Sequence, residues 1–331
     1  MTVTVINADV MTALRDLPSD HFGVVVTSPP YWGLRDYGID GQIGLEDTPE
    51  AFAARLVEAF REVRRVLRDD GTLWLNLGDS YAANRKYQVP STKGGAKHGP
   101  AQAAGGKGSV VPEGLKPKDL IGIPWRVAFA LQADGWYLRS EIIWAKPNPM
   151  PESVLDRPAT AHEKVFMFTK RGRYHYDAEA VRQGMAPSSL SRLAQNVDAQ
   201  AGSTRANGGA KTNGPMKAVG GEARNLRNYE PAPVQVWEIP TKGFKGAHFA
   251  TFPPELVRRC LQASLRPGDA VLDPFGGSGT TGLVADKFGA DATLIEINPE
   301  YCDLIRSRLA AGLVRLDQPA APMAAKAGAL I

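Results

Sequence analysis

Cysteine and long apolar runs are both scarce in this chain of 331 residues. Two cysteines, Cys260 and Cys302, and five histidines are too few to predict a disulfide framework or a zinc site. No uninterrupted apolar stretch reaches the roughly 18 residues that a membrane-spanning helix needs. The N-terminus also lacks a basic segment followed by a long apolar one, so we expect neither a membrane span nor a signal peptide. These absences predict a cytoplasmic protein.

The net charge is small as well, since 39 Lys and Arg stand against 35 Asp and Glu, giving +4. This balance permits a polyanionic partner without requiring one. Acids are nearly absent from residues 84–118, where seven Lys or Arg accompany seven Gly and a single acid, Glu113. A flexible basic loop of this kind can follow a phosphate backbone, with Arg85 and Lys86 as candidate phosphate contacts. A solvated linker explains the composition about equally well.

The most informative stretch is Thr27 to Trp32, with the sequence Thr-Ser-Pro-Pro-Tyr-Trp. It follows three valines, so a buried strand is predicted to end there. Pro29 and Pro30 fix the backbone and leave carbonyl oxygens free as acceptors beside the Ser28 hydroxyl, and Tyr31 adds an aromatic face. Such groups can hold a flat heterocycle and accept hydrogen bonds from its amino group. An ordinary turn with a surface aromatic accounts for the stretch alone about as well.

Strand-like and helix-like segments alternate along the chain, which predicts an α/β fold with a parallel sheet. Short apolar runs predict strands at residues 3–6, 23–27, 72–77, 135–144, 165–169, 271–273 and 293–295. Apolar residues at helical spacing predict helices at residues 10–17, 49–67, 123–133, 253–265 and 284–288. We expect Asp9 to cap the first helix, residues 69–71 to end the second, and Cys260 to pack in the core.

A glycine-rich turn follows one of the last predicted strands. Gly277, Gly279 and Gly282 match the dinucleotide-binding spacing, and Glu296 lies where a ribose-binding acid is expected. A nicotinamide or flavin oxidoreductase is therefore an open alternative. Asp273 argues against it, because a carboxylate at the mouth of the turn would repel a pyrophosphate but attract an ammonium group. Few residues follow Glu296, so the N-terminal strands must complete the sheet.

Four segments, in their order along the chain, resemble the beta class of site-specific DNA amino methyltransferases, the circularly permuted branch of the N-4/N-6 DNA methylase family. They are Thr27 to Tyr31 for the catalytic motif, residues 144–153 for the wall of the target-base pocket, Phe249 to Pro254 for a helix start, and Asp273 to Thr280 for the S-adenosylmethionine loop. The resemblance covers most of the chain. It implies a Rossmann-like S-adenosylmethionine-dependent methyltransferase fold with a seven-stranded, mostly parallel sheet and irregular DNA-recognition inserts. Residues 271–312 would supply two strands and residues 1–169 the others.

The resemblance also implies a role for each site residue. The cofactor-binding residues would be Asp9 for the adenine amine, Glu296 for the ribose hydroxyls, Asp273, Phe275, Gly277, Gly279 and Thr280 for the methionine end, and Phe252. The catalytic residues would be Ser28, Pro29, Pro30 and Tyr31. The DNA contacts would be Trp32, Trp144, Lys146, Asn148, Arg85 and Lys86. His162 and Glu163 resemble a recurring pair of the family, but we assign them a structural role, and we expect no metal.

The implied reaction is direct methyl transfer to the amino group of a base that is flipped out of the duplex. The base would stack on Tyr31 and donate to the Ser28 hydroxyl and the Pro29 carbonyl, so no covalent enzyme intermediate is needed. Methylation at C5 is disfavoured, because neither Cys260 nor Cys302 follows a proline. Serine at the first motif position favours cytosine N4, with adenine N6 as the alternative. A DNA-binding module with an inactive site is a third hypothesis, which the intact motif disfavours.

These assignments predict a division of the chain into five parts. They are residues 1–83 and 119–180 as the catalytic part, 84–118 as a basic insert, 181–240 as a target-recognition region, 241–315 as the cofactor-binding part, and 316–331 as a disordered tail. The predicted partners are double-stranded DNA and a cognate restriction endonuclease. Monomer and homodimer are both open, and DNA binding would place the protein at the nucleoid.

Overall fold

The computed structural model describes residues 2–33, 39, 41–82, 111, 114–182, 234–241 and 252–312. Contacts divide the chain into two units, residues 1–177 with 235–331, and residues 178–234. All the strands and helices given below belong to the first unit. Within the described residues, no helix is both long and apolar enough to cross a membrane.

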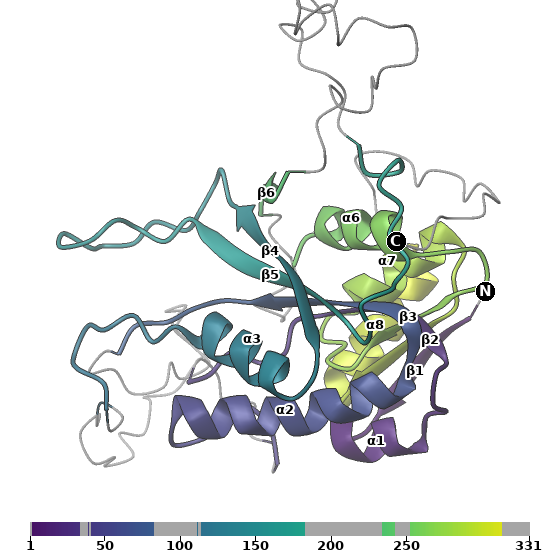
Figure 1. The fold of residues 1–331 in the computed structure, drawn as a ribbon, viewed down its shortest axis with the longest axis horizontal. Helices are drawn as coiled ribbons and strands as arrows, with labels where there is room; N and C mark the ends of the chain where they lie inside the picture. Colours follow the sequence, from purple (N-terminus) through teal and green to yellow (C-terminus); the bar gives the residue numbers. More distant parts are fainter. Residues whose placement is uncertain are drawn as a thin grey trace, which may run out of the picture. The chain divides into compact units, whose positions relative to one another are not determined.

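One mixed sheet lies at the centre of the first unit, with the strand order β1-β8-β7-β2-β3-β5-β4-β6 (Figure 1). The strands are β1 (Val3–Asn7), β2 (Phe22–Thr27), β3 (Leu67–Leu77), β4 (Tyr137–Ala145), β5 (His162–Thr169), β6 (Val236–Glu238), β7 (Ala270–Asp273) and β8 (Ala292–Glu296). β5 runs antiparallel to β3 and β4, and the other neighbouring pairs are parallel. The predicted α/β class with a mostly parallel sheet is confirmed. The sheet has eight strands rather than seven, because the short strand β6 pairs with β4.

Strands from both ends of the chain interleave in this sheet. β8 and β7, from the C-terminal part, lie between β1 and β2, from the N-terminal part. Asn7 pairs in register with Glu296, and Val25 with Leu272. The expectation that N-terminal strands complete the sheet is therefore confirmed.

Helices cover both faces of the sheet (Figure 1). On one face lie α1 (Val10–Asp16), α2 (Pro49–Val66) and α3 (Ile123–Ala133), and on the other α6 (Pro254–Ser264), α7 (Thr280–Phe288) and α8 (Pro299–Ala310). The first five contain or closely match the predicted helices. α8 was not predicted, although Asn298 caps it and a proline occupies its first turn.

The hydrophobic core packs α2 against β2 and β3. All six residues of β2 are buried, as its three consecutive valines predict. Fully buried side chains recur every three or four residues along α2: Phe52, Leu56, Phe60 and Val63. The helix begins after Thr48, whose Oγ1 accepts a hydrogen bond of 3.1 Å from the backbone N–H of Ala51. Burying one such apolar side chain contributes about 1.5–3 kcal/mol. This packing fixes the position of the end of β2, directly before Ser28.

The expectation that residues 69–71 end the second helix was wrong. α2 ends at Val66, and β3 begins at the next residue. Phe22 of β2 pairs with Leu67 and Val24 pairs with Thr72, so residues 68–71 form a bulge without partners in the β2–β3 register. Asp70 is held there by Arg266, with 2.6 Å between its Oδ2 and a guanidinium nitrogen. A Cβ on Gly71 would lie 2.8 Å from the carbonyl oxygen of Gly23. Asp70 therefore binds a distant arginine, and Asp69 pairs with Lys170 and Arg171.

Candidate active site

Candidate site residues gather at one edge of the sheet, where the parallel strands have their carboxyl ends; we call it the site edge. Asp9 follows β1, Glu296 ends β8, Asp273 ends β7, Ser28 follows β2 and Gly78 follows β3. Neighbouring strands lie about 4.8 Å apart, so such residues lie within reach of one ligand. In open α/β sheets this edge is where ligands bind. The predicted cofactor and catalytic motifs are thus brought together.

Asp273 joins the catalytic motif to the glycine-rich turn. Its side chain is 1% exposed, and Oδ1 accepts hydrogen bonds from the Thr27 hydroxyl (2.6 Å) and the Phe275 N–H (3.1 Å). Oδ2 accepts a hydrogen bond of 2.7 Å from the hydroxyl of Thr281 in α7. Burial raises the pKa of Asp273 to about 7, although these three hydrogen bonds oppose the shift. The carboxyl group therefore connects β2, β7 and α7 beneath the surface of the site.

The glycine-rich turn leads directly into α7. Gly277 and Gly279 have φ values of 51° and 79°, in the left-handed region that favours glycine. A Cβ on Gly279 would also lie 2.8 Å from Cγ2 of Ile305, so both the conformation and the space demand glycine. The Gly277 N–H donates a hydrogen bond of 2.7 Å to Oε2 of Glu296. Thr280 is buried at the start of the helix, with its Oγ1 3.3 Å from the hydroxyl of Ser278.

Glu296 and Asp9 place two further carboxylates along the site edge. Oε1 of Glu296 accepts a hydrogen bond of 2.8 Å from the Asn298 N–H, and burial raises the pKa of Glu296. Asp9 caps α1 as predicted, because its Oδ1 accepts from the N–H groups of Met11 (3.0 Å) and Thr12 (3.1 Å). Its Oδ2 makes no hydrogen bond to the residues that the structure describes. One oxygen of Asp9 is thus available to a ligand.

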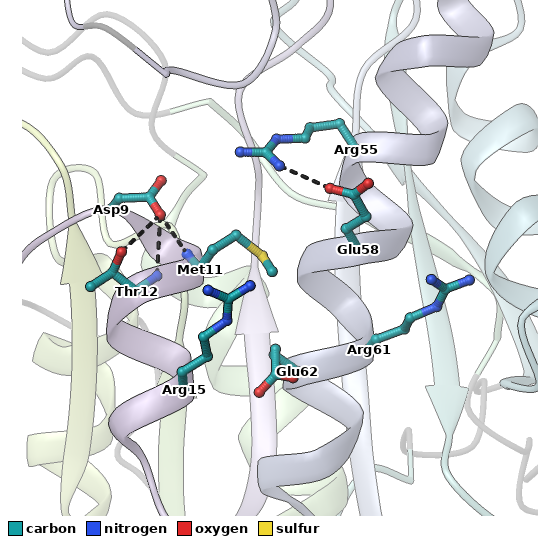
Figure 2. A pocket seen from close by; sticks show the side chains of 8 residues that line it. All are labelled: Asp9, Met11, Thr12, Arg15, Arg55, Glu58, Arg61 and Glu62. Carbon is teal, nitrogen blue, oxygen red and sulfur yellow. Dashed lines mark hydrogen bonds and ion pairs between the residues drawn. The ribbon is translucent and has the colours of Figure 1, made fainter.

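Asp9 also lines a hollow of about 540 Å³ between α1 and α2 (Figure 2). Arg55 and Glu58 of α2 form an ion pair of 2.8 Å. Figure 2 shows this pair and the Arg15 side chain, which reaches from α1 toward α2. The complete lining is Asp9, Met11, Thr12, Arg15, Arg55, Glu58, Arg61 and Glu62. Asp9 is the only predicted site residue among them, so this hollow does not contain the catalytic motif.

The Tyr31 hydroxyl lies in a cluster of polar side chains drawn from β3, β5 and the loop after β4. It donates a hydrogen bond of 2.6 Å to Oε2 of Glu163 and lies 3.4 Å from Oδ1 of Asn76. Oε2 of Glu163 also accepts from Nδ2 of Asn76 at 3.0 Å, and Oε1 accepts from the ammonium group of Lys146. Burial, together with the charge of Glu163, raises the pKa of Tyr31 well above its usual value, so Tyr31 stays protonated. We call these four residues, Tyr31, Asn76, Lys146 and Glu163, the tyrosine cluster.

Gly78 makes room for the Tyr31 ring. A Cβ on Gly78 would lie 2.5 Å from Cε2 of Tyr31, closer than any side chain tolerates. The ring is therefore confined at its edge by Gly78 and at its hydroxyl by Glu163.

The predicted wall segment lies beside this cluster, but Trp144 does not face outward. Trp144 is 3% exposed, and its Nε1 donates a hydrogen bond of 2.8 Å to the carbonyl of Ile239. The Lys146 ammonium lies 4.6 Å from the Trp144 ring centroid, which favours a cation–π contact. Asn148 exchanges hydrogen bonds with the backbone of Thr241 at 3.0 and 2.8 Å. Lys146 is thus the member of the segment that reaches Glu163.

The remaining predicted residues have varied surroundings. Pro29 is buried, whereas Ser28 and Pro30 are half-buried. The Trp32 Nε1 donates a hydrogen bond of 2.8 Å to the carbonyl of Glu46. Phe275 packs against the core, 6.4 Å from the ring of Phe60, and Phe252 is half-buried just before α6. Arg85 and Lys86 lie outside the described residues, as does most of the basic insert.

Two members of the tyrosine cluster, Asn76 and Glu163, were missed as site residues from the sequence. Glu163 had been assigned a structural role, yet it accepts hydrogen bonds from Tyr31 and Lys146. Because β5 runs antiparallel to its neighbours, its first residues lie at the site edge, and Glu163 pairs with Trp144. Asn76 was a polar residue among the apolar residues at the end of β3, a signal that could have marked it.

Neither cysteine is placed for chemistry at the site edge. Cys260 is fully buried in α6, which confirms the core-packing prediction, and burial raises the pKa of its thiol well above the usual value. Cys302 is buried in α8, with its sulfur 3.5 Å from the backbone carbonyl of Glu296. Within the described part of the chain, no three His, Cys, Asp or Glu side chains group closely enough to hold a metal ion.

Comparison with known proteins identifies the family. A family model described as DNA methylase, of the N6 and N4 type, matches residues 22–307. The chain belongs to this family. It is 52% identical over 307 residues to the Type II methyltransferase M.XycI of Xanthomonas campestris pv. cyanopsidis, an alignment that covers 92% of this chain and 87% of that one. The resemblance to the N-4/N-6 DNA methylase family is therefore confirmed, and so is the prediction of an S-adenosylmethionine-dependent DNA amino methyltransferase.

Solved structures show the same fold at low sequence identity. The PvuII DNA methyltransferase, described as cytosine-N4-specific, superposes with a TM-score of 0.60 at 18% identity, covering 96% of this chain and 88% of that one. A DNA modification methylase of Thermus thermophilus, TTHA0409, solved with S-adenosyl-L-methionine, gives a TM-score of 0.56 at 23% identity, with 95% of each chain covered. The comparisons give the oxidoreductase alternative no support.

Proposed function

We propose that this DNA amino methyltransferase modifies the N4 amino group of a cytosine that is flipped out of duplex DNA. The observation that carries the choice of base is Ser28, which occupies the first position of the catalytic motif at the end of β2, three residues before Tyr31. Serine in this position resembles the cytosine N4 members of the family. Adenine N6 is the second candidate, because a hydroxyl oxygen accepts from either amine. We also propose that the order of the motifs makes the chain a circularly permuted member.

The residues at the site edge fit S-adenosylmethionine. Oδ2 of Asp9, which has no partner among the described residues, can accept from the adenine amine. Glu296 can accept from the ribose hydroxyls, since each of its oxygens has one hydrogen bond and a carboxylate oxygen can take a second. The glycines at 277 and 279 keep the turn clear of side chains, and the negative charge of Asp273 attracts an ammonium group. When bound, the cofactor supplies an electrophilic methyl group.

The chain's own contribution to the reaction is positioning. The Tyr31 ring provides a stacking face for the flipped base, and the Ser28 hydroxyl and Pro29 carbonyl accept the hydrogen bonds of its amino group. These bonds direct the nitrogen lone pair away from the ring and toward the methyl group. Holding the two reactants in this geometry converts an encounter into a unimolecular step, for which effective molarities reach about 10⁵–10⁸ M. No side chain of the protein needs to act as a nucleophile.

Mass spectrometry of nucleosides tests the proposal. DNA from a host that lacks this enzyme is methylated with the purified protein, digested and analysed. We expect N4-methylcytosine, and N6-methyladenine alone would move the assignment to the second candidate. C5-methylcytosine, or no methylated nucleoside, would reject the proposed function. Sequencing of the modified DNA then locates the recognition motif, which is needed for the kinetic tests below.

DNA recognition is proposed to rest on two segments that lie mostly outside the described residues. The basic insert at 84–118, with Arg85 and Lys86, would contact phosphates, and residues 181–240 would read the target sequence. Removing residues 86–110 should weaken DNA binding and reduce the slope of log K against log salt, and an unchanged slope would show that the insert makes no phosphate contacts.

A restriction endonuclease of the same specificity is the proposed partner, and the nucleoid within the cytoplasm is the proposed location. A nuclease from the source cell that cleaves unmodified DNA, but not DNA methylated by this protein, would be identified as the partner.

A further inference from the structure

Glu163 lies where its carboxylate can fix the orientation of the Tyr31 ring. It accepts hydrogen bonds from three side chains of the tyrosine cluster, at 2.6 Å from the Tyr31 hydroxyl and 3.0 Å from Nδ2 of Asn76, and also from the Lys146 ammonium. The side chains of Lys146 and Glu163 are 19% and 16% exposed, so the ion pair is largely removed from solvent. Such a charge-assisted arrangement holds its members in one geometry more firmly than a surface pair does.

A neighbouring ion pair, Glu141–Lys164, offers a comparison for the Lys146–Glu163 pair. Glu141 of β4 binds Lys164 of β5 at 2.9 Å, with side-chain exposures of 30% and 18%. This pair joins β4 to β5, and the Lys146–Glu163 pair joins the residue after β4 to β5, with a similar degree of burial. The Glu141–Lys164 pair only links β4 to β5. The Glu163 carboxylate also accepts a hydrogen bond from Tyr31, the residue on which the target base is predicted to stack.

Lys146 extends the same connection to the segment after β4. Its backbone N–H donates a hydrogen bond of 2.8 Å to the carbonyl of Ala161. This bond joins the first and last residues of the segment 146–161, which connects β4 to β5. Glu163 therefore links the Tyr31 ring to the base of this connection and, through Asn76, to β3.

We propose that Glu163 is a positioning residue for methyl transfer, which fixes the plane of the Tyr31 ring by accepting its hydroxyl hydrogen bond while Lys146 and Asn76 hold the carboxylate in place. The inference rests on the proposed stacking role of Tyr31. Glu163 acts through Tyr31 and touches neither the base nor the cofactor. A ring free to tilt would offer the flipped base a poorly defined surface, and the reacting atoms would lose their alignment.

A double-mutant cycle tests the proposal with the full-length protein and a duplex containing the mapped motif. The variants are Glu163→Gln, Tyr31→Phe and the two together, and single-turnover rates of methyl transfer are measured with labelled S-adenosylmethionine. We expect each single substitution to lower the rate on the order of 10- to 100-fold, with an unchanged dissociation constant for S-adenosylmethionine. The double variant should lose no more than the slower single variant, because both changes act on the same hydrogen bond: Tyr31→Phe removes its donor, and Glu163→Gln replaces its charged acceptor with a neutral one. The proposal would be overturned if the rate loss of the double variant equalled the product of the two single losses, or if either single variant kept the wild-type rate.

Glu141→Gln is the matched control, since it removes a carboxylate from a similar ion pair between β4 and β5. We expect it to retain the wild-type rate, and a loss equal to that of Glu163→Gln would mean that the rate only reports strand packing. Should Glu163→Gln fail to fold, Tyr31→Phe still decides, because it keeps the ring and Glu163 but removes the hydrogen bond. An inactive wild type would reject the proposed function, whereas an active wild type with unaffected variants would reject this inference alone.

Discussion

The hydroxyl of Thr27 donates a hydrogen bond of 2.6 Å to the carboxyl group of Asp273, 246 residues further along the chain. Thr27 immediately precedes the Ser-Pro-Pro-Tyr motif, and Asp273 lies just before the glycine-rich turn, separated from it by Pro274 and Phe275. Both side chains are buried, so the bond is not exchanged with water. It holds the two halves of the candidate active site in a fixed relation, although each half comes from a different end of the sequence.

Replacing Thr27 with valine should therefore weaken both folding and cofactor binding. The change keeps the shape of the side chain but leaves Asp273 with one hydrogen bond fewer, which costs about 1–3 kcal/mol of unfolding free energy. Thr72→Val is the control, because Thr72 is also buried and its Oγ1 has no hydrogen-bond partner among the described residues. We expect the control to be neutral or stabilising. Chemical denaturation and calorimetry with S-adenosylmethionine measure the two effects, and equal stability changes in both variants would contradict the expectation.

The raised pKa of Asp273 predicts that folding becomes less stable as pH rises. Its pKa is about 7 in the folded protein and 3.8 in the reference state, so the folded protein binds the proton more tightly. The contribution of Asp273 to stability is then fully present below about pH 4 and is lost as pH rises through 7. Asp273→Asn should remove this part of the pH dependence, which amounts to a few kcal/mol at most. The comparison is between denaturation curves of the two proteins at pH 5 and pH 8. Parallel changes in both would show that Asp273 does not titrate in this range.

The same carboxyl group should make cofactor binding depend on pH. An ammonium group close to Asp273 favours its charged form, so binding should lower its pKa and grow tighter from pH 5 to pH 7, a range in which an α-amino group keeps its own proton. Asp273→Asn should bind weakly and show little of this trend. If wild type and variant have the same pH profile in calorimetry, the ammonium group does not lie near Asp273.

Local patterns in the sequence predicted the parts of the fold whose causes are local. The three valines of β2 and the apolar spacing of α2 report burial directly, so both elements were located to within a few residues. The ends of α2 and β3 depend instead on Arg266, which binds Asp70 from 196 residues away. No pattern within residues 67–72 contains that information. The three residues of β6 are likewise too few for a periodic signal.

The candidate site divides in the same way. Motifs that lie on continuous stretches, such as Ser28 to Tyr31, were found because proline, glycine and carboxylate positions follow one another in the chain. Glu163 enters the site only through the antiparallel register of β5, which a single sequence does not reveal. Trp144 was predicted as a DNA contact, yet its ring is covered, since the pairing of β4 with β6 places it against Ile239.

Gly279 should tolerate alanine less well than another glycine with the same backbone conformation. Gly268 and Gly279 have φ values of 83° and 79°, so alanine at either position carries a strain of about 1–2 kcal/mol. A Cβ at Gly268 meets nothing within 4 Å, whereas at Gly279 it would lie 2.8 Å from Cγ2 of Ile305. Thermal unfolding should therefore show a larger loss for Gly279→Ala, and only this variant should bind S-adenosylmethionine less tightly. Equal losses would indicate that Ile305 moves aside without cost.

Gly78→Ala should impair methyl transfer through the Tyr31 ring and leave the cofactor site intact. The new Cβ would lie 2.5 Å from Cε2 of Tyr31, so the ring must shift, and a displacement of this kind can cost on the order of 100-fold in rate. Gly172→Ala is the control, since its Cβ would meet only Tyr137, at an ordinary 3.8 Å. Single-turnover kinetics and calorimetry separate the two effects: we expect a slower transfer step with unchanged affinity for S-adenosylmethionine. The loss should also disappear when Gly78→Ala is added to a Tyr31→Ala protein, because no ring remains to be displaced. A further loss in that background would place the damage in β3 itself, and the ring would then not be its cause.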